Sequence, residues 1–295
     1  MSSFLNALPG ACAQGLMWGI MAIGVYITFR VLDFADLTVD GTISTGGAVL
    51  VMSMLSGANV YEALLFAFLA GCIAGFITGL LHTSFGIPPI LSGILTQLAL
   101  YSINLRILGR ANQSISVRNH QLLVNIGNIS YSITILIVMV ILLIAILYWF
   151  FGTELGCSIR ATGCNQSMAR ANGINTNMNK IIALVLSNGI VALAGGLLAQ
   201  YQGFADVNSG RGAIVIGLAA VIIGEVLFSR IFRNFALKLL AAAIGGVAYY
   251  VIMQLVISMG LNTDDLKLIS AMIVALFLGL PYWKSQLLEA HGKTH

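Results

Sequence analysis

The chain has 295 residues, of which 59% are hydrophobic and only 8% charged, and its formal net charge is +4. A soluble domain carries about 25% charged residues, so this composition excludes a water-soluble globule, and its high apolar content excludes a disordered chain. At about 20 apolar residues per crossing, nine helices would use about 180 residues and leave no room for a soluble catalytic domain of ordinary size. The sequence therefore predicts an all-α, polytopic membrane protein in which residues 1–295 form a single transmembrane domain.

Nine apolar windows follow one another along the chain, and eight to ten transmembrane helices is the expected range. Three of the windows, those that begin at Thr42, Ala213 and Leu268, are short for a full crossing, so they are expected to be tilted, broken or re-entrant. The windows are Ala11 to Phe29, Thr42 to Ala58, Tyr61 to His82, Pro89 to Leu105, Ser130 to Phe151, Ile181 to Tyr201, Ala213 to Phe228, Leu239 to Met259 and Leu268 to Tyr282.

The segment after the first window is acidic and has no helical or strand period. It contains Asp33, Asp36 and Asp40, and Gly41 follows as a flexible joint. Such a segment is either a solvated loop or irregular backbone that lines a cavity, because irregular chain at membrane depth must face protein or water.

The fourth window carries a polar stripe. Gly93, Gln97, Tyr101 and Asn104 share one helical face, and Thr96 lies beside them. A polar stripe in a membrane helix either bonds to neighbouring helices or lines a path.

The loops indicate an orientation. Two are long, the loop from Arg106 to Ile129 and the loop from Gly152 to Lys180. With the N-terminus outside, the inner side holds nine basic residues and the outer side five, which favours an external N-terminus and a cytoplasmic C-terminus. The inner nine are Arg30, Arg160, Arg170, Lys180, Arg230, Arg233, Lys238, Lys284 and Lys293, and the outer five are Arg106, Arg110, Arg118, Arg211 and Lys267.

The loop 152–180 is expected to contain a short helix. Asn165 is a good N-cap and Gly173 suits a left-handed position after the helix ends. A helix of under two turns is unstable alone in water, so it is either an ordinary connector or a segment that docks against a partner.

Glu225 ends the seventh apolar window. With Arg230 and Arg233 close behind it, we expect an interfacial ion pair, and a proton carrier is the alternative.

Neither a catalytic site nor a metal site is indicated. Cys12, Cys72, Cys157 and Cys164 form no CxxC pair, and the only GK[ST] string, Gly292 to Thr294, lacks the glycine that a phosphate-binding loop requires. The scattered basic residues do not form a nucleic-acid surface. The expectation is a protein that is not an enzyme, binds no cofactor itself, and takes its energy from a gradient or a partner.

Two long strings in the chain resemble a known family. These are LDFADLTVDGT from Leu32 and ILTQLALYSINLRILGRAN from Ile94. Together with the loop 152–175 and the glycine-rich run from Gly212 to Gly224, they resemble permease subunits of bacterial ABC importers of the branched-chain amino acid and ribose type. The similarity is greatest to the subgroup described as permeases for tryptophan or related amino acids.

The resemblance implies a set of partners. These are an ABC ATPase dimer that binds ATP and Mg²⁺, a second permease copy, an extracytoplasmic substrate-binding protein, and the lipid of the bacterial cytoplasmic membrane. It makes the helix from Asn165 to Gly173 the coupling helix that sits in a groove of the ATPase. The expected coupling residues are Gly163, Asn165, Met168, Ala169, Arg170 and Gly173.

The translocation path is expected at the two-fold axis of a homodimer. Carboxylates and amides placed against lipid would lose hydration without return, whereas a hydrated path satisfies them. The expected path residues are Asp36, Thr38, Asp40, Thr42, Thr96, Gln97, Tyr101 and Asn104.

A different class stays open at this stage. In an ion-coupled secondary transporter, Asp36, Asp40 or Glu225 would carry protons and no ATPase would be needed. The likeness between the segments that begin at Thr45 and Ile244 would suit the internal repeats of either class.

Overall fold

The computed structural model describes residues 2–115, 122–228, 232, 234–259, 268–277 and 279. Six of its helices are long and apolar enough to cross a membrane, by length and composition. Three shorter apolar helices bring the apolar helices among the described residues to nine, and they begin near the three windows expected to be short. The all-α polytopic fold predicted from the sequence is thus confirmed. The arginines at positions 230 and 233 lie outside the described residues.

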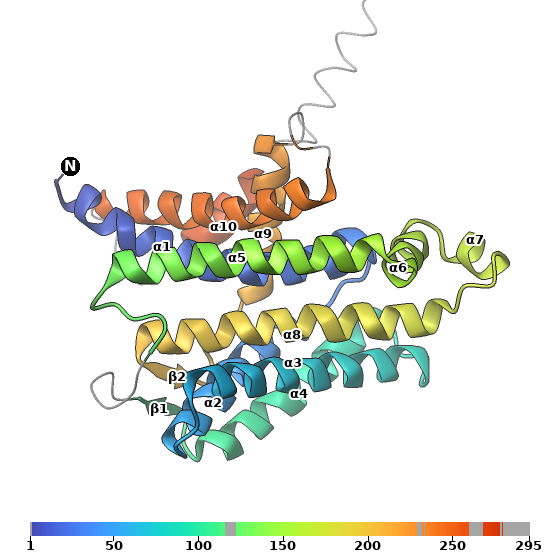
Figure 1. Cartoon of the computed structure of the whole chain (residues 1–295), viewed down its shortest axis with the longest axis horizontal. Coiled ribbons are helices and arrows are strands. Elements are labelled where there is room, and N and C mark those ends of the chain that lie inside the picture. Colours follow the sequence, from blue (N-terminus) through green and yellow to red (C-terminus); the bar gives the residue numbers. More distant parts are fainter. Residues whose placement is uncertain are drawn as a thin grey trace, which may run out of the picture.

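Figure 1 shows the long helices aligned with the longest axis of the molecule, with the N-terminus at one end and α7 protruding at the other. The helices are α1 (Ser2–Tyr26), α2 (Val39–Leu55), α3 (Val60–Thr83), α4 (Pro89–Leu108), α5 (Ile129–Gly152), α6 (Glu154–Cys164), α7 (Gln166–Ala171), α8 (Thr176–Gln202), α9 (Ala213–Phe228), α10 (Phe235–Ser258), and a further short helix, Leu268–Phe277.

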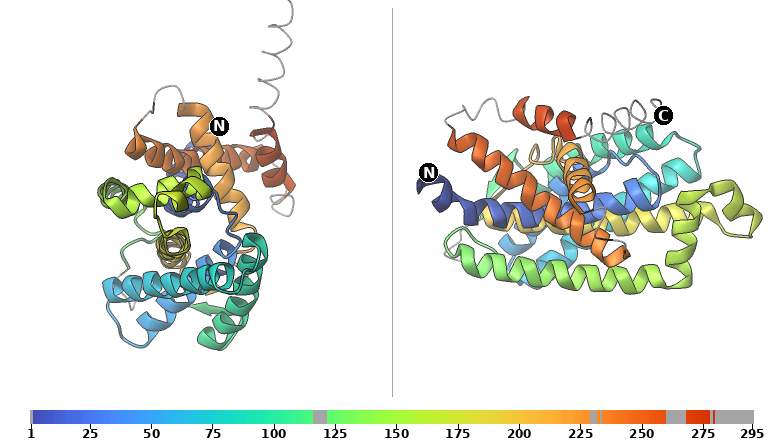
Figure 2. Two further views of the ribbon diagram at one scale, coloured as in Figure 1. Left: turned by 90° about the vertical axis from the view of Figure 1, so that its right-hand side faces the viewer. Right: turned by 90° about the horizontal axis from the view of Figure 1, so that it is seen from above.

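Helix α8 forms the centre of the bundle. It packs against α1, α2 and α3, and the end-on view in Figure 2 places α3 and α4 on one side of it and α9 and α10 on the other. Small residues allow this packing: a Cβ added at Gly46 of α2 would lie 1.9 Å from the carbonyl oxygen of Ala192, and one at Gly71 of α3 would lie 2.3 Å from that of Asn188. One turn further along α3, a Cβ added at Gly75 would lie 2.2 Å from the carbonyl oxygen of Leu184.

The acidic segment is irregular backbone buried in protein. Helix α1 continues as a π-helical turn, η1 (Ile27–Val31), and the chain then turns back through Asp33, which has a left-handed φ of 54°. Asp36 is only 3% exposed. The sequence left open whether this segment is a solvated loop or irregular backbone that lines a cavity. Asp36 is buried, so it does not lie in a solvated loop.

Two three-residue strands join the loops at the end of the bundle that also holds the N-terminus. Strand β1 (Asn112–Ser114) pairs antiparallel with β2 (Phe204–Asp206), with Gln113 opposite Ala205. This pairing ties the chain that follows α4 to the chain that follows α8.

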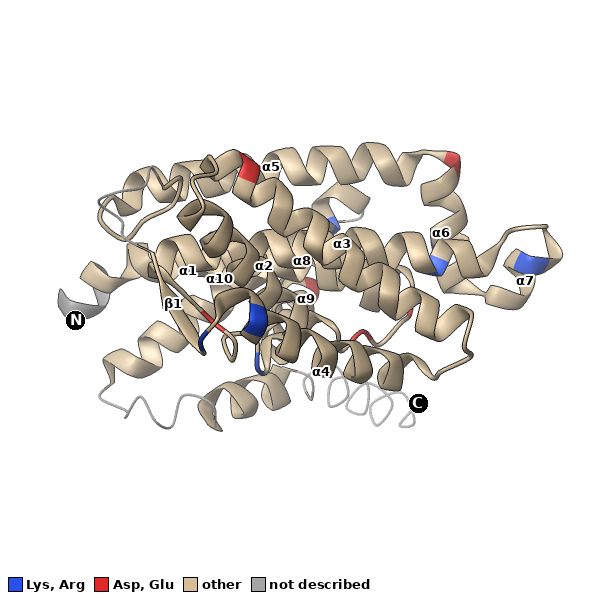
Figure 3. Ribbon diagram, turned by 90° about the horizontal axis from the view of Figure 1, so that it is seen from below, with Lys and Arg blue, Asp and Glu red and all other residues tan. Residues whose placement is uncertain are grey.

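Charged residues are rare along the long helices, as Figure 3 shows, and one of the basic segments lies on α7. The six long helices therefore expose mainly apolar side chains.

Candidate functional site

A buried hydrogen-bond network joins α2, α3, α4 and α8 beneath the acidic segment. Asp36 accepts a hydrogen bond from the backbone N–H of Thr38 (2.9 Å) and another from Asn188 Nδ2 (2.8 Å). Thr42 donates to Asn188 Oδ1 (2.7 Å). The predicted path residues Asp36 and Thr42 are thus brought together by one amide of α8.

A chain of hydroxyl groups extends this network. Thr38 Oγ1 lies 2.8 Å from Thr78 Oγ1, and Thr78 donates to Thr96 Oγ1 (2.9 Å). All three side chains are buried. Thr38 and Thr96 are therefore hydrogen-bonded, through Thr78, to other helices of the same protein molecule, and their place on a translocation path stays a prediction.

Asp40 caps helix α9 from a different element. Its Oδ2 accepts from Gly212 N (2.9 Å) and its Oδ1 from Ile214 N (2.8 Å), at the first turn of the helix. An N-terminal turn leaves backbone N–H groups without intrahelical acceptors, and a carboxylate satisfies them and favours the helix dipole. Asp40 thereby fixes the loop that carries Arg211.

The stripe on α4 divides into buried and exposed parts. Asn104 is buried and its Nδ2 lies 3.5 Å from the carbonyl oxygen of Gly41, while its Oδ1 has no partner among the described residues. Gln97 is half-buried, and Tyr101 is 42% exposed. The guanidinium of Arg211 lies over the ring of Tyr101, with Cζ 5.8 Å from the ring centroid.

This exposed part combines an aromatic ring, a cation and an amide. Arg211 has no acidic partner among the described residues. A guanidinium is a preferred partner of carboxylates, and an aromatic ring stacks with apolar or aromatic groups. The surface around Tyr101 and Arg211 can therefore bind a small molecule that carries both a carboxylate and an aromatic group.

The predicted short helix is present as α7. Asn165 caps it by accepting from Met168 N (3.0 Å), and Gly173 follows it with a φ of 77°. The helix from Asn165 to Gly173 is thus confirmed as a local structure. Helix α6, which the sequence analysis did not predict, precedes it and is capped by Thr153, whose Oγ1 accepts from Gly156 N (3.3 Å).

The expected coupling residues differ in accessibility. Met168 and Arg170 are exposed, and Arg170 Nε donates to Thr176 Oγ1 (2.9 Å) at the start of α8. Ala169 is completely buried, so it holds α7 in place and offers no surface to a partner. Gly163 packs against η1, where a Cβ on it would lie 1.9 Å from the carbonyl oxygen of Val31.

Glu225 pairs with a residue that the sequence analysis did not connect to it. Arg30 of η1 donates to Glu225 Oε2 from both Nε and Nη2. Arg230 and Arg233, the partners expected from the sequence, lie outside the described residues. Arg30 and Asn188 were missed as site residues because their partners are 195 and 152 positions away, respectively, and no local pattern links them.

No group of three His, Cys, Asp or Glu side chains that could hold a metal ion occurs within the described part of the chain. All four cysteines are free thiols.

Comparison with known proteins identifies the family to which the chain belongs. Residues 9–280 match the family described as Branched-chain amino acid transport system / permease component. The chain belongs to this family. The resemblance found in the sequence is confirmed, and the chain is a multi-pass membrane permease of the ABC importer type and not an enzyme in itself. Family membership decides against the ion-coupled alternative.

Two curated relatives of this permease are similar over most of its length. One, the tyrosine transport system permease protein of Clostridioides difficile (strain R20291), is 39% identical over 93% of this chain and 91% of its own. Another, the autoinducer 2 import system permease protein LsrC of Yersinia pseudotuberculosis serotype O:3 (strain YPIII), is 30% identical over 70% of this chain and 58% of its own. The solved structure of PsaBC from Streptococcus pneumoniae in complex with Fab shares the fold, with a TM-score of 0.55 at 13% identity over 94% of each chain.

Proposed function

We propose that two copies of this permease form the membrane path of an ATP-driven importer of an aromatic amino acid. The observation that carries the substrate class is Arg211, a cation without an acidic partner among the described residues, placed over the ring of Tyr101. An amino acid zwitterion supplies the carboxylate that such a cation binds. The relative named as a tyrosine transport system permease supports the same class.

The composition of α4 supports a path along its exposed face. Helices α4 and α5 are both mostly exposed in the single chain, with 28% and 17% of their apolar windows buried. Their mean hydropathy differs, 1.3 for α4 against 3.0 for α5. Exposed polar groups are costly against lipid, so α5 faces lipid while α4, with Gln97 and Tyr101, faces a second copy and the path.

The end of the bundle with α6 and α7 is proposed to contact an ATPase dimer, which binds ATP and Mg²⁺. Helix α7 protrudes from the bundle and exposes Met168, and a short capped helix of this kind gains stability by docking. At the other end of the molecule, an extracytoplasmic binding protein delivers the amino acid.

Two contacts connect the proposed ATPase side to the network around Asp36. Gly163 of α6 lies against the backbone of Val31, a few residues before Asp36. Asn179 of α8 donates to Thr162 of α6 (2.9 Å) and accepts from Ser158 (3.2 Å). Movement of α6 and α7 is therefore passed directly to η1 and α8.

The proposed orientation places α7 in the cytoplasm and the N-terminus outside. Cys157 and Cys164 are exposed at the α6 and α7 end and serve as native probes. A membrane-impermeant maleimide should label them in inverted vesicles and not in intact cells. A cysteine introduced at Asn112, at the opposite end, should show the reverse pattern, and labelling of Cys164 from outside would contradict the orientation.

Uptake by the purified complex tests the function. The complex is isolated through a tag on this chain, reconstituted in vesicles, and assayed with radiolabelled tyrosine, tryptophan and leucine. We expect ATP-dependent uptake of an aromatic amino acid, reduced about tenfold or more by Arg211→Gln, since a hydrogen bond to a charged group contributes roughly 1.5–3 kcal/mol.

Arg110→Gln is the matched control. Arg110 is also an exposed arginine, lies at the same end of the bundle, and donates a hydrogen bond to Gln113. Its uptake should stay near that of the unmodified chain. Uptake driven by a proton gradient without ATP would contradict the ATP-driven mechanism. Equal losses in both variants would remove the substrate role of Arg211.

A further inference from the structure

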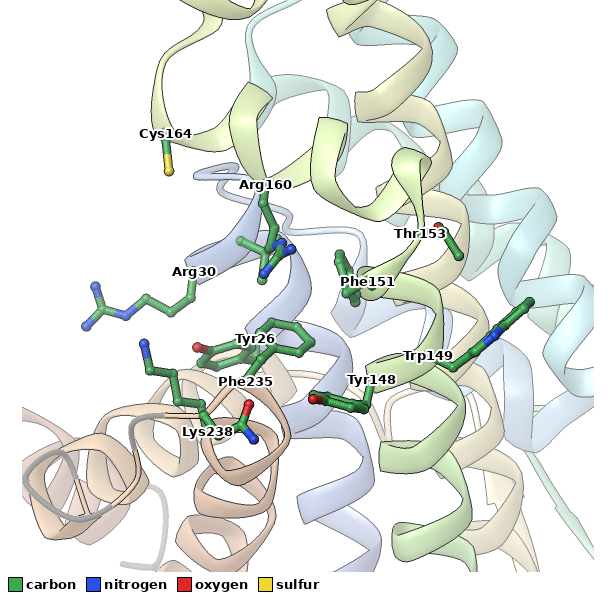
Figure 4. Close-up of a pocket in the computed structure, with 13 residues that line it drawn as sticks. Tyr26, Arg30, Tyr148, Trp149, Phe151, Thr153, Arg160, Cys164, Phe235 and Lys238 are labelled. Carbon is green, nitrogen blue, oxygen red and sulfur yellow. The ribbon is translucent and has the colours of Figure 1, made fainter.

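A second site lies away from the path, where α1, α5, α6 and the start of α10 meet. It is a pocket of about 820 Å³. Figure 4 shows Arg160 of α6 and Lys238 of α10 approaching it from opposite sides, with Arg30 beside them and the rings of Tyr26 and Phe235 between. Three elements distant in sequence thus bring three basic side chains to one space.

The charges in this pocket are not balanced. Arg30 is paired with Glu225. Among the described residues, Arg160 contacts only uncharged groups, with Nη2 3.2 Å from Cys157 Sγ and Cζ 5.9 Å from the ring centroid of Phe235. The ammonium of Lys238 makes no hydrogen bond or ion pair with any described residue. The pocket therefore carries an excess of two positive charges, which an anionic ligand would neutralise.

The end of α5 forms one wall of the pocket. Tyr148 and Trp149 line it near the end of α5, the most apolar of the long helices, and Trp149 is 72% exposed. Tyrosine and tryptophan are enriched where a membrane protein meets the lipid head groups. This end of α5, and the pocket beside it, therefore lies at head-group level.

We propose that this pocket binds the head group of an anionic phospholipid, with its phosphate between Arg160 and Lys238. Its volume corresponds to roughly 25 water molecules at about 30 Å³ each, far more than one phosphate ion fills. The aromatic lining suits the glycerol and the first methylene groups of the acyl chains. A free phosphate ion shares the charge chemistry, but it would leave this apolar lining exposed to water.

Native mass spectrometry of the purified full-length permease tests the proposal. The protein is titrated with phosphatidylglycerol and, separately, with phosphatidylcholine of the same acyl chains. We expect tighter binding of phosphatidylglycerol, weakened about fivefold by Arg160→Gln or Lys238→Gln and about 30-fold by both, since one basic residue near an anionic lipid surface contributes about 1 kcal/mol. Arg106→Gln, at an exposed arginine of the opposite end, should change the affinity little.

Further variants separate the remaining outcomes. A double variant that keeps both charges, Arg160→Lys with Lys238→Arg, should retain most of the phosphatidylglycerol binding. This result would show that the weaker binding of the glutamine variants comes from the lost charge and not from misfolding. Equal affinity for the two lipids, or an equal loss in Arg106→Gln, would overturn the proposal. Displacement of the bound phosphatidylglycerol by excess inorganic phosphate would instead assign the site to a soluble anion.

Discussion

The amide of Asn188 is a single side chain that completes the hydrogen bonding of two others. It donates to Asp36 and accepts from Thr42, and all three are buried near the centre of the bundle. A buried polar group without a partner costs about 1–3 kcal/mol, so Asn188 stabilises both the acidic segment and the start of α2.

Replacing Asn188 by alanine should therefore destabilise the permease by roughly 1–3 kcal/mol, because it removes the amide donor of the buried Asp36 Oδ2, while the Thr42 hydroxyl keeps its hydrogen bond to the carbonyl oxygen of Thr38 (3.0 Å). The loss is measured as a lower thermal unfolding midpoint in detergent. Asn177→Ala, an exposed position on the same helix, is the matched control and should leave the midpoint unchanged. Equal midpoints for the two variants would show that the network contributes nothing to stability.

At this scale the sequence predicts which residues matter better than it predicts their partners. Asp36 and Asp40 stand out because a carboxylate among apolar spans is costly, and both are indeed held by specific donors. Their partners come from α8 and from the start of α9. Those contacts depend on how the helices pack, and no periodicity in the sequence encodes that.

Among the elements, the apolar helices were predicted from the sequence, but of the two polar helices only α7 was predicted and α6 was not. Length and apolar composition are local properties, so the windows in the sequence correspond to the helices that the structure describes. Helix α6 has only 11 residues and includes the charged Glu154 and Arg160, so no apolar window marks it, and Thr153 at its start was not recognised as a cap. Strands β1 and β2 were missed because three residues carry no usable alternation.

The contact between α6 and η1 gives a prediction about coupling. Gly163→Ala would place a Cβ 1.9 Å from the carbonyl oxygen of Val31, so α6 must move away from η1. We expect the stimulation of ATP hydrolysis by substrate to fall about tenfold or more, since a displacement of about 1 Å can cost up to 100-fold in rate even when it lies far from the chemistry.

Gly152→Ala is the control for this change, because a Cβ there has no neighbour within 4 Å. The coupled ATPase activity of the reconstituted complex is the measurement, with size-exclusion profiles to show that the complex remains assembled. Full stimulation in Gly163→Ala would mean that the contact with η1 does not transmit the coupling.

For the whole molecule, the difference between α4 and α5 predicts which face meets a second copy. A cysteine at Tyr101 of α4, in a chain whose four native cysteines are replaced by serine, should form disulfide-linked dimers in membranes upon mild oxidation. A cysteine at Ile141, an exposed position on α5, should not, because that helix is proposed to face lipid. Dimers through position 141 alone would place the two-fold axis along α5 and overturn the proposed path.

The central position of α8 has a mechanical consequence. Its 27 residues span about 40 Å at 1.5 Å per residue, from the first turn, which contacts α6 and α7, to Gln202. A stiff rod of that length magnifies rotation: a tilt of about 3° about its first turn displaces the far end by about 2 Å. Because α2 and α3 touch α8 backbone to backbone, they must swing with it. A small angular change at the proposed ATPase side would thus become an ångström-scale displacement at the far end of α8 without any helix unwinding.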